Sequence, residues 1–224
     1  MKHIEYLAII PARGNSKRIK NKNLIKFRKK TLVENTLEVV KNINKVGLTV
    51  LSSDSKKILN IGQKFKKCLN ILRPKKISGS KASVESSIFH ALNILEEKRY
   101  KIKNIILLQP TSPLRSKKDI EGSINKYEKK KLNSIFSCYE KKPFLWKKKF
   151  KSFLSVSYNY NERKISQKME NLYFENGAVY IFNVKEFKKI KNRIIKPFDI
   201  FLMDEIRSLD IDIKEDIRLL KKME

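Results

Sequence analysis

The order of apolar segments along the chain is the feature that most restricts its fold. Short apolar runs at Tyr6–Ile10, Val46–Ser52 and Asn104–Gln109 are typical of buried strands. They alternate with Thr31–Ile43 and Ala82–Glu97, in which apolar residues recur at helical spacing. Strands that alternate with helices of about 10–15 residues indicate βαβ units. The sequence therefore predicts an α/β fold with a doubly wound, mainly parallel sheet.

The remaining pattern fits one domain, 1–224, with an insertion. Further elements are expected as strands at Leu69–Leu72, Asn133–Tyr139, Gly177–Asn183 and Leu209–Ile213, and as helices that follow Asp54 up to about Lys67 and that lie at Ser116–Lys130 and at Lys214–Met223. Between Glu140 and Phe174 the chain is basic, aromatic and irregular. We interpret this segment, about 140–174, as an inserted β-arm.

The charge is the next constraint. Lys and Arg number 52 against 23 Asp and Glu, a formal net charge of +29, as expected of a nucleic-acid binder. Most of these cations are lysines spread along the whole chain, which favours a solvated surface and attraction of an anionic substrate over specific nucleic-acid recognition. No apolar run approaches the roughly 18 residues of a membrane span. Cys68 and Cys138 lack metal-ligand spacing and predict two reduced thiols in a cytoplasmic protein.

The loop after the first strand is a candidate ligand-binding segment. It contains one glycine, Gly14, and several cations, among them Arg13 and Lys22, which suit phosphate groups. In a doubly wound fold this loop lies at the carboxyl edge of the sheet, where ligands bind. It matches neither the P-loop nor the dinucleotide-binding glycine pattern.

Two other segments add candidate chemistry. Asp210 and Asp212 alternate with apolar residues, which places both carboxylates on one face and predicts a Mg²⁺ site. Gln109 ends a strand directly before Pro110, and Pro113 follows, so the turn should hold Gln109 in a fixed position.

Together these segments resemble the acylneuraminate cytidylyltransferase family, the CMP-sialic acid synthetases. The resemblance rests on five motifs in family order: A-R-G-N-S-K…K-N-L within Ile10–Leu24, Arg73-Pro74, L-L-Q-P-T-S-P-L-R at Leu107–Arg115, N-G-A-V-Y-I at Asn176–Ile181, and L-D-I-D at Leu209–Asp212. It covers nearly the whole chain.

The resemblance implies a nucleotidyltransferase that joins CTP to a nonulosonic acid, a nine-carbon 2-keto sugar acid, and releases pyrophosphate. It also implies residue roles, which fall on Arg13, Ser16, Lys22 and Asn23 for the triphosphate and nucleotide, Arg73 and Ser83 for the cytidine side, Gln109, Gln167, Asn176 and Tyr180 for the sugar, and Asp210 and Asp212 for Mg²⁺. Arg13, Lys22 and Asp212 are the expected catalytic residues, with Asp212 the preferred acceptor of the proton from the sugar hydroxyl. A homodimer is implied, in which the arm completes the neighbour's sugar pocket.

Departures from the family pattern lie on the sugar side. An Arg-Gln pair of the N-acetylneuraminate enzymes aligns here with Ser166-Gln167, while Arg163 and Lys164 lie slightly upstream. An aromatic pair of the family falls near Arg193-Ile194. The hypothesis is that cytidylyl transfer is retained and that the acceptor is a different nonulosonate, such as legionaminic or pseudaminic acid.

Three alternatives stay open from the sequence. The chain could be a cytidylyltransferase of the same fold for another keto sugar acid, Kdo. It could be a lysine-rich nucleic-acid-binding protein, or a degenerate relative without activity. The presence of Arg13, Lys22, Gln109 and both aspartates argues against the last of these.

Overall fold

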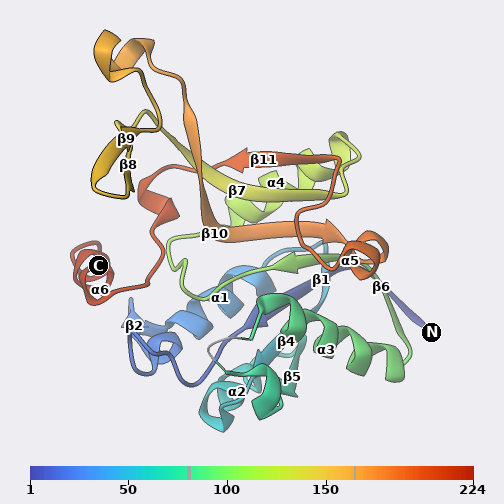
Figure 1. The fold of residues 1–224 in the computed structure, drawn as a ribbon. Helices are drawn as coiled ribbons and strands as arrows, with labels where there is room; N and C mark the ends of the chain where they lie inside the picture. The colour runs from blue at the N-terminus through green and yellow to red at the C-terminus, as the bar shows by residue number, and fades with distance from the viewer. Residues whose placement is uncertain (80–81, 164) are drawn as a thin grey trace.

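A central sheet organises the molecule, which the computed structural model describes over residues 1–79, 82–163 and 165–224. Seven strands of these ranges form the sheet in the order β11-β7-β10-β6-β1-β4-β5 (Figure 1). Their bounds are β1 (Lys2–Pro11), β4 (Val46–Ser53), β5 (Cys68–Leu72), β6 (Tyr100–Leu107), β7 (Ser134–Lys141), β10 (Leu172–Asn183) and β11 (Phe198–Leu202). β10 runs antiparallel to both of its neighbours, and the other ladders are parallel. The predicted mainly parallel sheet is confirmed.

Helices cover both faces of the sheet. On one face lie α1 (Leu32–Lys41), α2 (Lys56–Gly62) and α4 (Lys117–Lys129), and on the other α3 (Val84–Glu97) and α5 (Val184–Ile190). Strand β1 explains the two cores, because its successive side chains point to opposite faces. Tyr6, Ala8 and Ile10 enter the first core, whereas Leu7 and Ile9 enter the second.

Two helix starts follow the capping chemistry of the sequence. Thr31 accepts a hydrogen bond from the Glu34 amide, and the Glu34 carboxylate accepts one from the Thr31 amide, which together form a capping box. Ser116 and Asp119 form the same box at the start of α4. These boxes satisfy backbone donors that the first turn of a helix leaves free.

The prediction of a strand at Leu209–Ile213 is wrong. The segment joins no ladder, and its backbone is held by a hydrogen bond from the Ile211 amide to the Thr111 carbonyl, 2.8 Å. Ile211 is buried in a small apolar cluster with Ile19 and Leu220, where the C-terminal helix α6 (Lys214–Lys221) packs on the first loop. The alternation of apolar and polar residues therefore arises because the buried Ile211 lies between Asp210 and Asp212, which face a cleft.

Several elements were not predicted. They are a short hairpin of β2 (Lys26–Phe27) and β3 (Lys30–Thr31), helix α5, and the edge strand β11. Strand β10 also begins at Leu172, five residues before the expected start, and continues from the inserted segment into the sheet.

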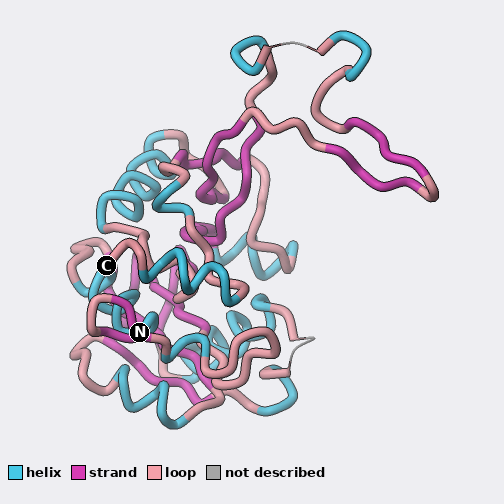
Figure 2. Tube along the Cα trace, turned by 90° about the vertical axis from the view of Figure 1, so that its left-hand side faces the viewer, coloured by secondary structure: helices cyan, strands magenta, loops and turns pink. Residues whose placement is uncertain are grey.

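The inserted segment projects from the body of the molecule. Strands β7 and β10 extend beyond the sheet as a pair, with Lys141 opposite Leu172. Between these residues a hairpin of β8 (Trp146–Lys149) and β9 (Ser152–Ser155) stands away from the core (Figures 1 and 2). We call residues 142–171 the arm. Its role in dimerisation stays a prediction.

Both cysteines are free thiols in the structure. Burial raises the pKa of Cys68 and of Cys138 to about 11, so both thiols stay protonated at neutral pH. None of the described helices is long and apolar enough to cross a membrane. A cytoplasmic location stays a prediction.

Edge strand β11 supports a prediction about acid stability. Although partial burial opposes ionisation, hydrogen bonds from Lys130, the Ile200 amide and Lys126 lower the pKa of Asp199 to about 2. An unfolded Asp titrates near pH 3.9. The stability that Asp199 contributes is therefore complete above about pH 4 and is lost as the pH falls towards about 2.

We expect Asp199→Asn to lower the free energy of unfolding at pH 7 and to match the parent protein near pH 2. Urea unfolding between pH 7 and pH 2 checks this, with Glu215→Gln on the exposed face of α6 as the control. A difference between variant and parent that stays constant over this range contradicts the prediction.

Candidate active site

A cleft opens at the carboxyl ends of β1 and β6. These strands are neighbours in the sheet, and from β1 the connections run first towards β4 and β5 and then back to β6. Ligands in open α/β sheets bind where the strand order reverses in this way. Pro11, the last residue of β1, and Gln109, which follows β6, both line the cleft. The position of the cleft thus follows from the topology.

One half of the cleft is strongly basic, with a volume of about 330 Å³. Its cations are Arg13, Lys17, Arg18, Lys22 and Arg73. The first turn of α3 also lines it, and the positive end of a helix favours an anion. We call this half the basic pocket. Its charge suits a polyphosphate.

Lys22 is fixed at the floor of the basic pocket. Its Nζ donates to the Ile211 carbonyl at 2.6 Å and to the Asp212 carboxylate at 3.0 Å, and its side chain is 14% exposed. Arg18 also pairs with Asp212. Although partial burial opposes it, Lys22 and Arg18 lower the pKa of Asp212. The ionised carboxylate is therefore favoured, which suits a cation ligand better than a proton acceptor.

Asp210 lies on the same side of the cleft in a different environment. Its side chain reaches the solvent of the cleft, yet the surrounding protein raises the pKa of its carboxyl, and a hydrogen bond with Thr111 only partly opposes this. Asp210 and Asp212 flank the buried Ile211 and both line the basic pocket. The predicted pair is thus brought together.

The carboxylate pair fits a hard cation. Mg²⁺ is commonly held by one or two carboxylates, with water and substrate phosphates as the other ligands. Asp210 and Asp212 offer such oxygens beside a pocket suited to phosphates. No group of three metal-ligating side chains occurs among the described residues, so a cation held here would take its other ligands from phosphate and water.

The other residues predicted to bind the nucleotide divide into two kinds. Arg13 and Ser16 face the basic pocket, and Arg13 donates to the Gly79 carbonyl at 3.0 Å. Asn23 is 7% exposed and donates its amide to the Arg13 carbonyl at 2.8 Å, so it holds the loop. Ser83 caps α3 and accepts from the Ser86 amide at 3.1 Å while lining the pocket.

Arg73 is the most buried cation of the basic pocket. It is 5% exposed, and its guanidinium donates to the Ser52 hydroxyl at 3.2 Å and to the Ser52 carbonyl at 2.7 Å. Burial lowers the pKa of Arg73 to about 10, so it remains charged at neutral pH. These bonds tie the end of β4 to the pocket wall.

The second half of the cleft is larger, about 630 Å³, and differs in charge. Its charged lining residues are Glu175, Glu205 and Asp210, and no lysine or arginine of the described part of the chain joins them. We call it the acidic pocket. It meets the basic pocket at Gln109 and Asp210, which line both. Gln109 packs over Gly177, whose φ of +70° favours glycine.

Tyr180 belongs to a polar cluster beside the acidic pocket. Its hydroxyl donates to Glu175, and the guanidinium of Arg193 lies over its ring, 4.6 Å from the ring centre. Burial and Glu175 raise the pKa of Tyr180, so the phenol stays protonated. Arg193 in turn pairs with Glu85 at 2.5 Å. Sequence reasoning missed this cluster because its members lie up to 108 positions apart.

Two residues predicted to bind the sugar do not present free side chains to the acidic pocket. Asn176 borders the acidic pocket, but its amide is engaged by Ser137, Ala178 and Ser208. Gln167 lies exposed on the arm and does not line the cleft, and its carbonyl accepts from Lys142 at 3.1 Å. Lys164 lies outside the described residues, as does the side chain of Ser166.

The sequence and the fold that carry these two pockets are similar to those of known proteins. The sequence model of one family, described as cytidylyltransferase, matches residues 7–224. The chain belongs to the cytidylyltransferase family. Members of such a family transfer the CMP part of CTP to an acceptor and release pyrophosphate. The resemblance inferred from the five motifs is confirmed at this level.

Individual relatives agree with the family. A pseudaminic acid cytidylyltransferase of Campylobacter jejuni is 28% identical over 221 residues, which cover 96% of this chain and 94% of the relative. An N-acylneuraminate cytidylyltransferase of Escherichia coli is also 28% identical, over 95% of this chain and 50% of the relative. A solved CMP-2-keto-3-deoxy-manno-octonic acid synthetase in complex with CTP superposes with a TM-score of 0.71 at 13% identity, over 98% of each chain. That similarity shows a shared fold.

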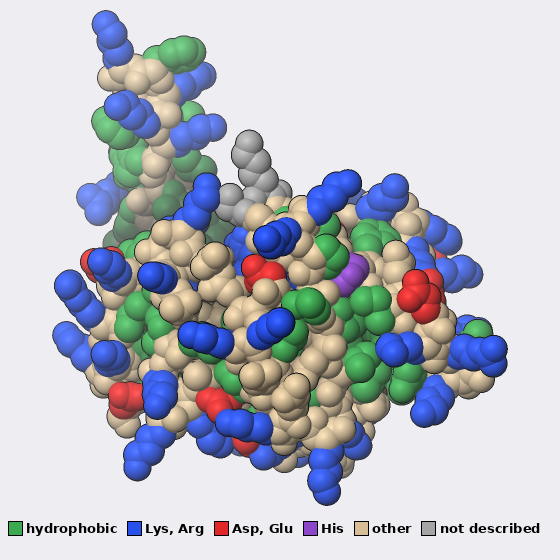
Figure 3. All heavy atoms as spheres, turned by 90° about the horizontal axis from the view of Figure 1, so that it is seen from below, with side chains coloured by type: hydrophobic (Ala, Val, Ile, Leu, Met, Phe, Trp, Pro, Cys, Tyr) green, Lys and Arg blue, Asp and Glu red, His purple; other side chains and the backbone are tan. Residues whose placement is uncertain are grey.

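Family membership favours the enzyme over the nucleic-acid-binding alternative. The surface agrees, because lysine and arginine side chains are spread over the face in Figure 3 among polar and apolar ones. The cations that gather in the basic pocket suit an anionic substrate such as a nucleoside triphosphate.

Proposed function

We propose that this cytidylyltransferase joins CTP to a nonulosonic acid and releases pyrophosphate, with CTP in the basic pocket and the sugar acid in the acidic pocket. The meeting of the two pockets at Gln109 and Asp210 carries the proposal. A hydroxyl of a sugar in one pocket would face the α-phosphorus of a nucleotide in the other. The attack of the anomeric hydroxyl on this phosphorus forms the new P–O bond as the bond to pyrophosphate breaks, and the proton of the hydroxyl passes to water.

The basic pocket stabilises the charge of this reaction. Lys22 and Arg13 would contact phosphate oxygens and neutralise negative charge that builds up as pyrophosphate leaves. Asp210 and Asp212 would hold Mg²⁺, which when bound draws electron density from the phosphoryl oxygens. Lys22 keeps Asp212 ionised for that task. Arg73 and Ser83 stand at the side assigned to cytidine, where Arg73 orders the wall and Ser83 caps the start of α3.

The acceptor is the finer part of the proposal. A pseudaminic acid enzyme and an N-acylneuraminate enzyme share the same identity with this chain, so overall similarity does not favour either sugar. The sequence differs from the N-acetylneuraminate pattern at Ser166-Gln167 and near Arg193. We therefore propose an acceptor such as legionaminic or pseudaminic acid.

Pyrophosphate release tests this function. Purified protein with Mg²⁺ and CTP is offered N-acetylneuraminate, legionaminate, pseudaminate or Kdo, with UTP and ATP as nucleotide controls. We expect release with CTP and legionaminate or pseudaminate. Turnover of N-acetylneuraminate alone would contradict the proposed acceptor, and turnover of Kdo alone would show that the acceptor is not a nonulosonic acid. A protein that neither reacts nor is protected from heat by CTP would contradict the proposed function.

The arm supports the further proposal of a homodimer. A sugar acid carries a carboxylate, yet the charged residues that line the acidic pocket are acidic. A cation from a second copy would complete this pocket. The hairpin exposes apolar side chains that a partner would cover, with Phe150 90% and Phe153 66% exposed, and lysines 147–149 lie beside them.

Changing the exposed face of the arm tests the dimer. We expect Phe153→Asp to shift the protein from dimer to monomer in light scattering and to raise the KM for the acceptor more than that for CTP, because a charge is placed in an apolar contact. Ile190→Asp is the control, since Ile190 is exposed on α5 away from the arm. A dimer that persists in Phe153→Asp would contradict the placement of the interface.

A further inference from the structure

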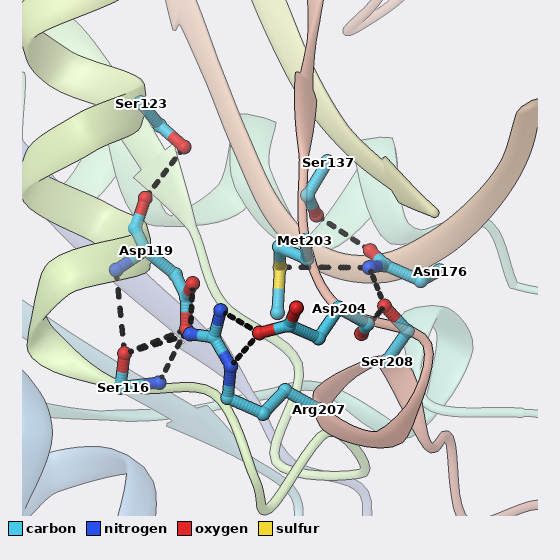
Figure 4. Close-up of polar contacts among 9 residues, drawn as sticks. All are labelled: Ser116, Asp119, Ser123, Ser137, Asn176, Met203, Asp204, Arg207 and Ser208. Atoms are coloured by element: carbon cyan, nitrogen blue, oxygen red, sulfur yellow. Dashed lines mark hydrogen bonds and ion pairs between the residues drawn. The ribbon is translucent and has the colours of Figure 1, made fainter. Parts of the chain in front are cut away.

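The short 3₁₀ turn Ile206–Ser208 precedes Asp210 by two residues and is fixed from two sides. On one side Ser208 receives a hydrogen bond from the Asn176 side-chain amide, 2.8 Å, and on the other Arg207 reaches the start of α4 (Figure 4). Neither contact was expected from the sequence. Both act on the segment that delivers the carboxylate pair to the cleft.

The Asn176 side chain uses its polar atoms within the protein. Its oxygen accepts from the Ser137 hydroxyl at 2.6 Å and from the Ala178 amide at 3.1 Å. Its nitrogen donates to Ser208, and the Met203 sulfur lies 3.5 Å from it. The residue is 5% exposed, so this network excludes most solvent. A side chain engaged in this way is better suited to holding the backbone than to contacting a sugar.

The Ser208 hydroxyl connects the Asn176 side chain to the backbone of the turn. It donates to the Asp204 carbonyl at 2.8 Å and so closes the turn on itself. A line of hydrogen bonds therefore runs from β7 through Asn176 of β10 to the turn, as Figure 4 shows.

Arg207 holds the turn from the opposite side. Its guanidinium pairs with Asp204 through two nitrogens and with the Asp119 carboxylate at 2.5 Å. Asp119 has only 3% of its side chain exposed and also caps α4. Planar, paired contacts of this kind give an arginine a defined orientation. The turn is thus tied to α4 as well as to β10.

The backbone between Ser208 and Ile211 is held at both ends. Residue 208 is fixed by Asn176, and the Ile211 amide donates to the Thr111 carbonyl at 2.8 Å. Asp210 lies between these two anchors. The position of its carboxylate is therefore set by Asn176 and Ser208, which do not line the basic pocket, and by Thr111, which does.

We propose that Asn176 and Arg207 are positioning residues, which clamp the turn Ile206–Ser208 and so set the position of Asp210 for metal and CTP binding. This inference rests on the proposed metal pair. Groups that orient metal-ligating carboxylates typically alter metal affinity by about tenfold or more when they are changed. The role of Asn176 then differs from the sugar contact that the sequence predicts.

The test uses the full chain with two readouts. Hydrogen exchange of the segment 206–213 is measured in the free protein, and Mn²⁺ binding to CTP-saturated protein is followed by electron paramagnetic resonance, with a CTP-only titration subtracted. The variants are Ser208→Ala, Arg207→Gln and Asn176→Ala. The control is Arg218→Gln, an exposed arginine of α6 that pairs only loosely with Glu215 at 4.0 Å.

We expect faster exchange of 206–213 in the three variants, about tenfold weaker Mn²⁺ binding, and a KM for the acceptor within about twofold of the parent. Arg218→Gln should match the parent in each measurement. Faster exchange with unchanged Mn²⁺ affinity would overturn the proposal, because the turn would then have a structural role only. A raised acceptor KM in Asn176→Ala with unchanged Mn²⁺ binding would also overturn it and restore the sugar contact.

Asp210→Asn separates failure of the clamp from failure of the metal pair. If Asp210→Asn loses Mn²⁺ binding while Ser208→Ala and Arg207→Gln keep it, the clamp is wrong and the metal pair stands. If Asp210→Asn binds Mn²⁺ as the parent does, the metal pair itself is wrong and the clamp proposal falls with it.

Discussion

Asp210→Asn is expected to lower kcat by about 10²–10³-fold at saturating CTP and acceptor. The amide keeps the size of the side chain but removes the negative charge that the proposed cation needs. Asp210 also lines both pockets, so its loss acts where the two substrates would meet. Steady-state pyrophosphate release with varied Mg²⁺ measures the effect, and the variant should need more Mg²⁺ for half-maximal rate.

Glu215→Gln is the matched control for this charge change. Glu215 lies five residues further along, in the first turn of α6, with 66% of its side chain exposed. Its neutralisation should leave kcat within about twofold, as for most surface substitutions. A kcat for Asp210→Asn equal to that of Glu215→Gln would remove Asp210 from the catalytic machinery.

Arg115→Met is expected to destabilise the protein by about 3 kcal/mol, because the guanidinium satisfies several buried acceptors. Arg115 is 3% exposed and donates to the carbonyls of Gln109 and Ala178 at 3.0 and 2.8 Å, and to the Thr36 hydroxyl at 3.1 Å. Burial lowers the pKa of Arg115 to about 10, and Asp119 only partly offsets this. For a chain of this size the loss corresponds to a fall in Tm of about 6–12 °C.

The same variant should also slow the enzyme, since Arg115 holds the backbone of Gln109 at the junction of the pockets. Thermal unfolding and kcat are measured together, with Arg115→Lys as the variant that keeps the charge but loses the planar fork. We expect Arg115→Lys to fall between the parent and Arg115→Met. A Tm within about 1 °C of the parent for Arg115→Met would contradict the proposed contribution.

The elements that the sequence predicts well are those whose burial follows a simple period. Strand β1 lies between two helical layers, so its apolar run is continuous, and α1 begins at a capping box readable from Thr31 and Glu34. Edge strand β11 gives no such signal. It has five residues, one of them Asp199, and it pairs with β7 on one side only.

The candidate site divides in a similar way. Residues in local motifs, such as Arg13, Lys22 and the aspartate pair, were assigned from sequence and lie together in the basic pocket. Contacts between distant segments were beyond sequence reasoning, because no local pattern records that Arg193 stacks on Tyr180 or that Arg207 meets Asp119. Leu209–Ile213 shows the limit of alternation, which reports which side chains are buried and not whether the backbone pairs.

The arm leaves and re-enters the sheet at adjacent points, since Lys141 lies opposite Leu172. A segment whose ends are neighbours can change in length without moving the strands that carry it, because closing a longer loop costs little extra free energy. Mutation and recombination can therefore alter or exchange residues 142–171 while the nucleotide chemistry is retained. On this view the arm is a replaceable module, and grafting it between relatives would change the acceptor if the arm completes the sugar pocket as proposed.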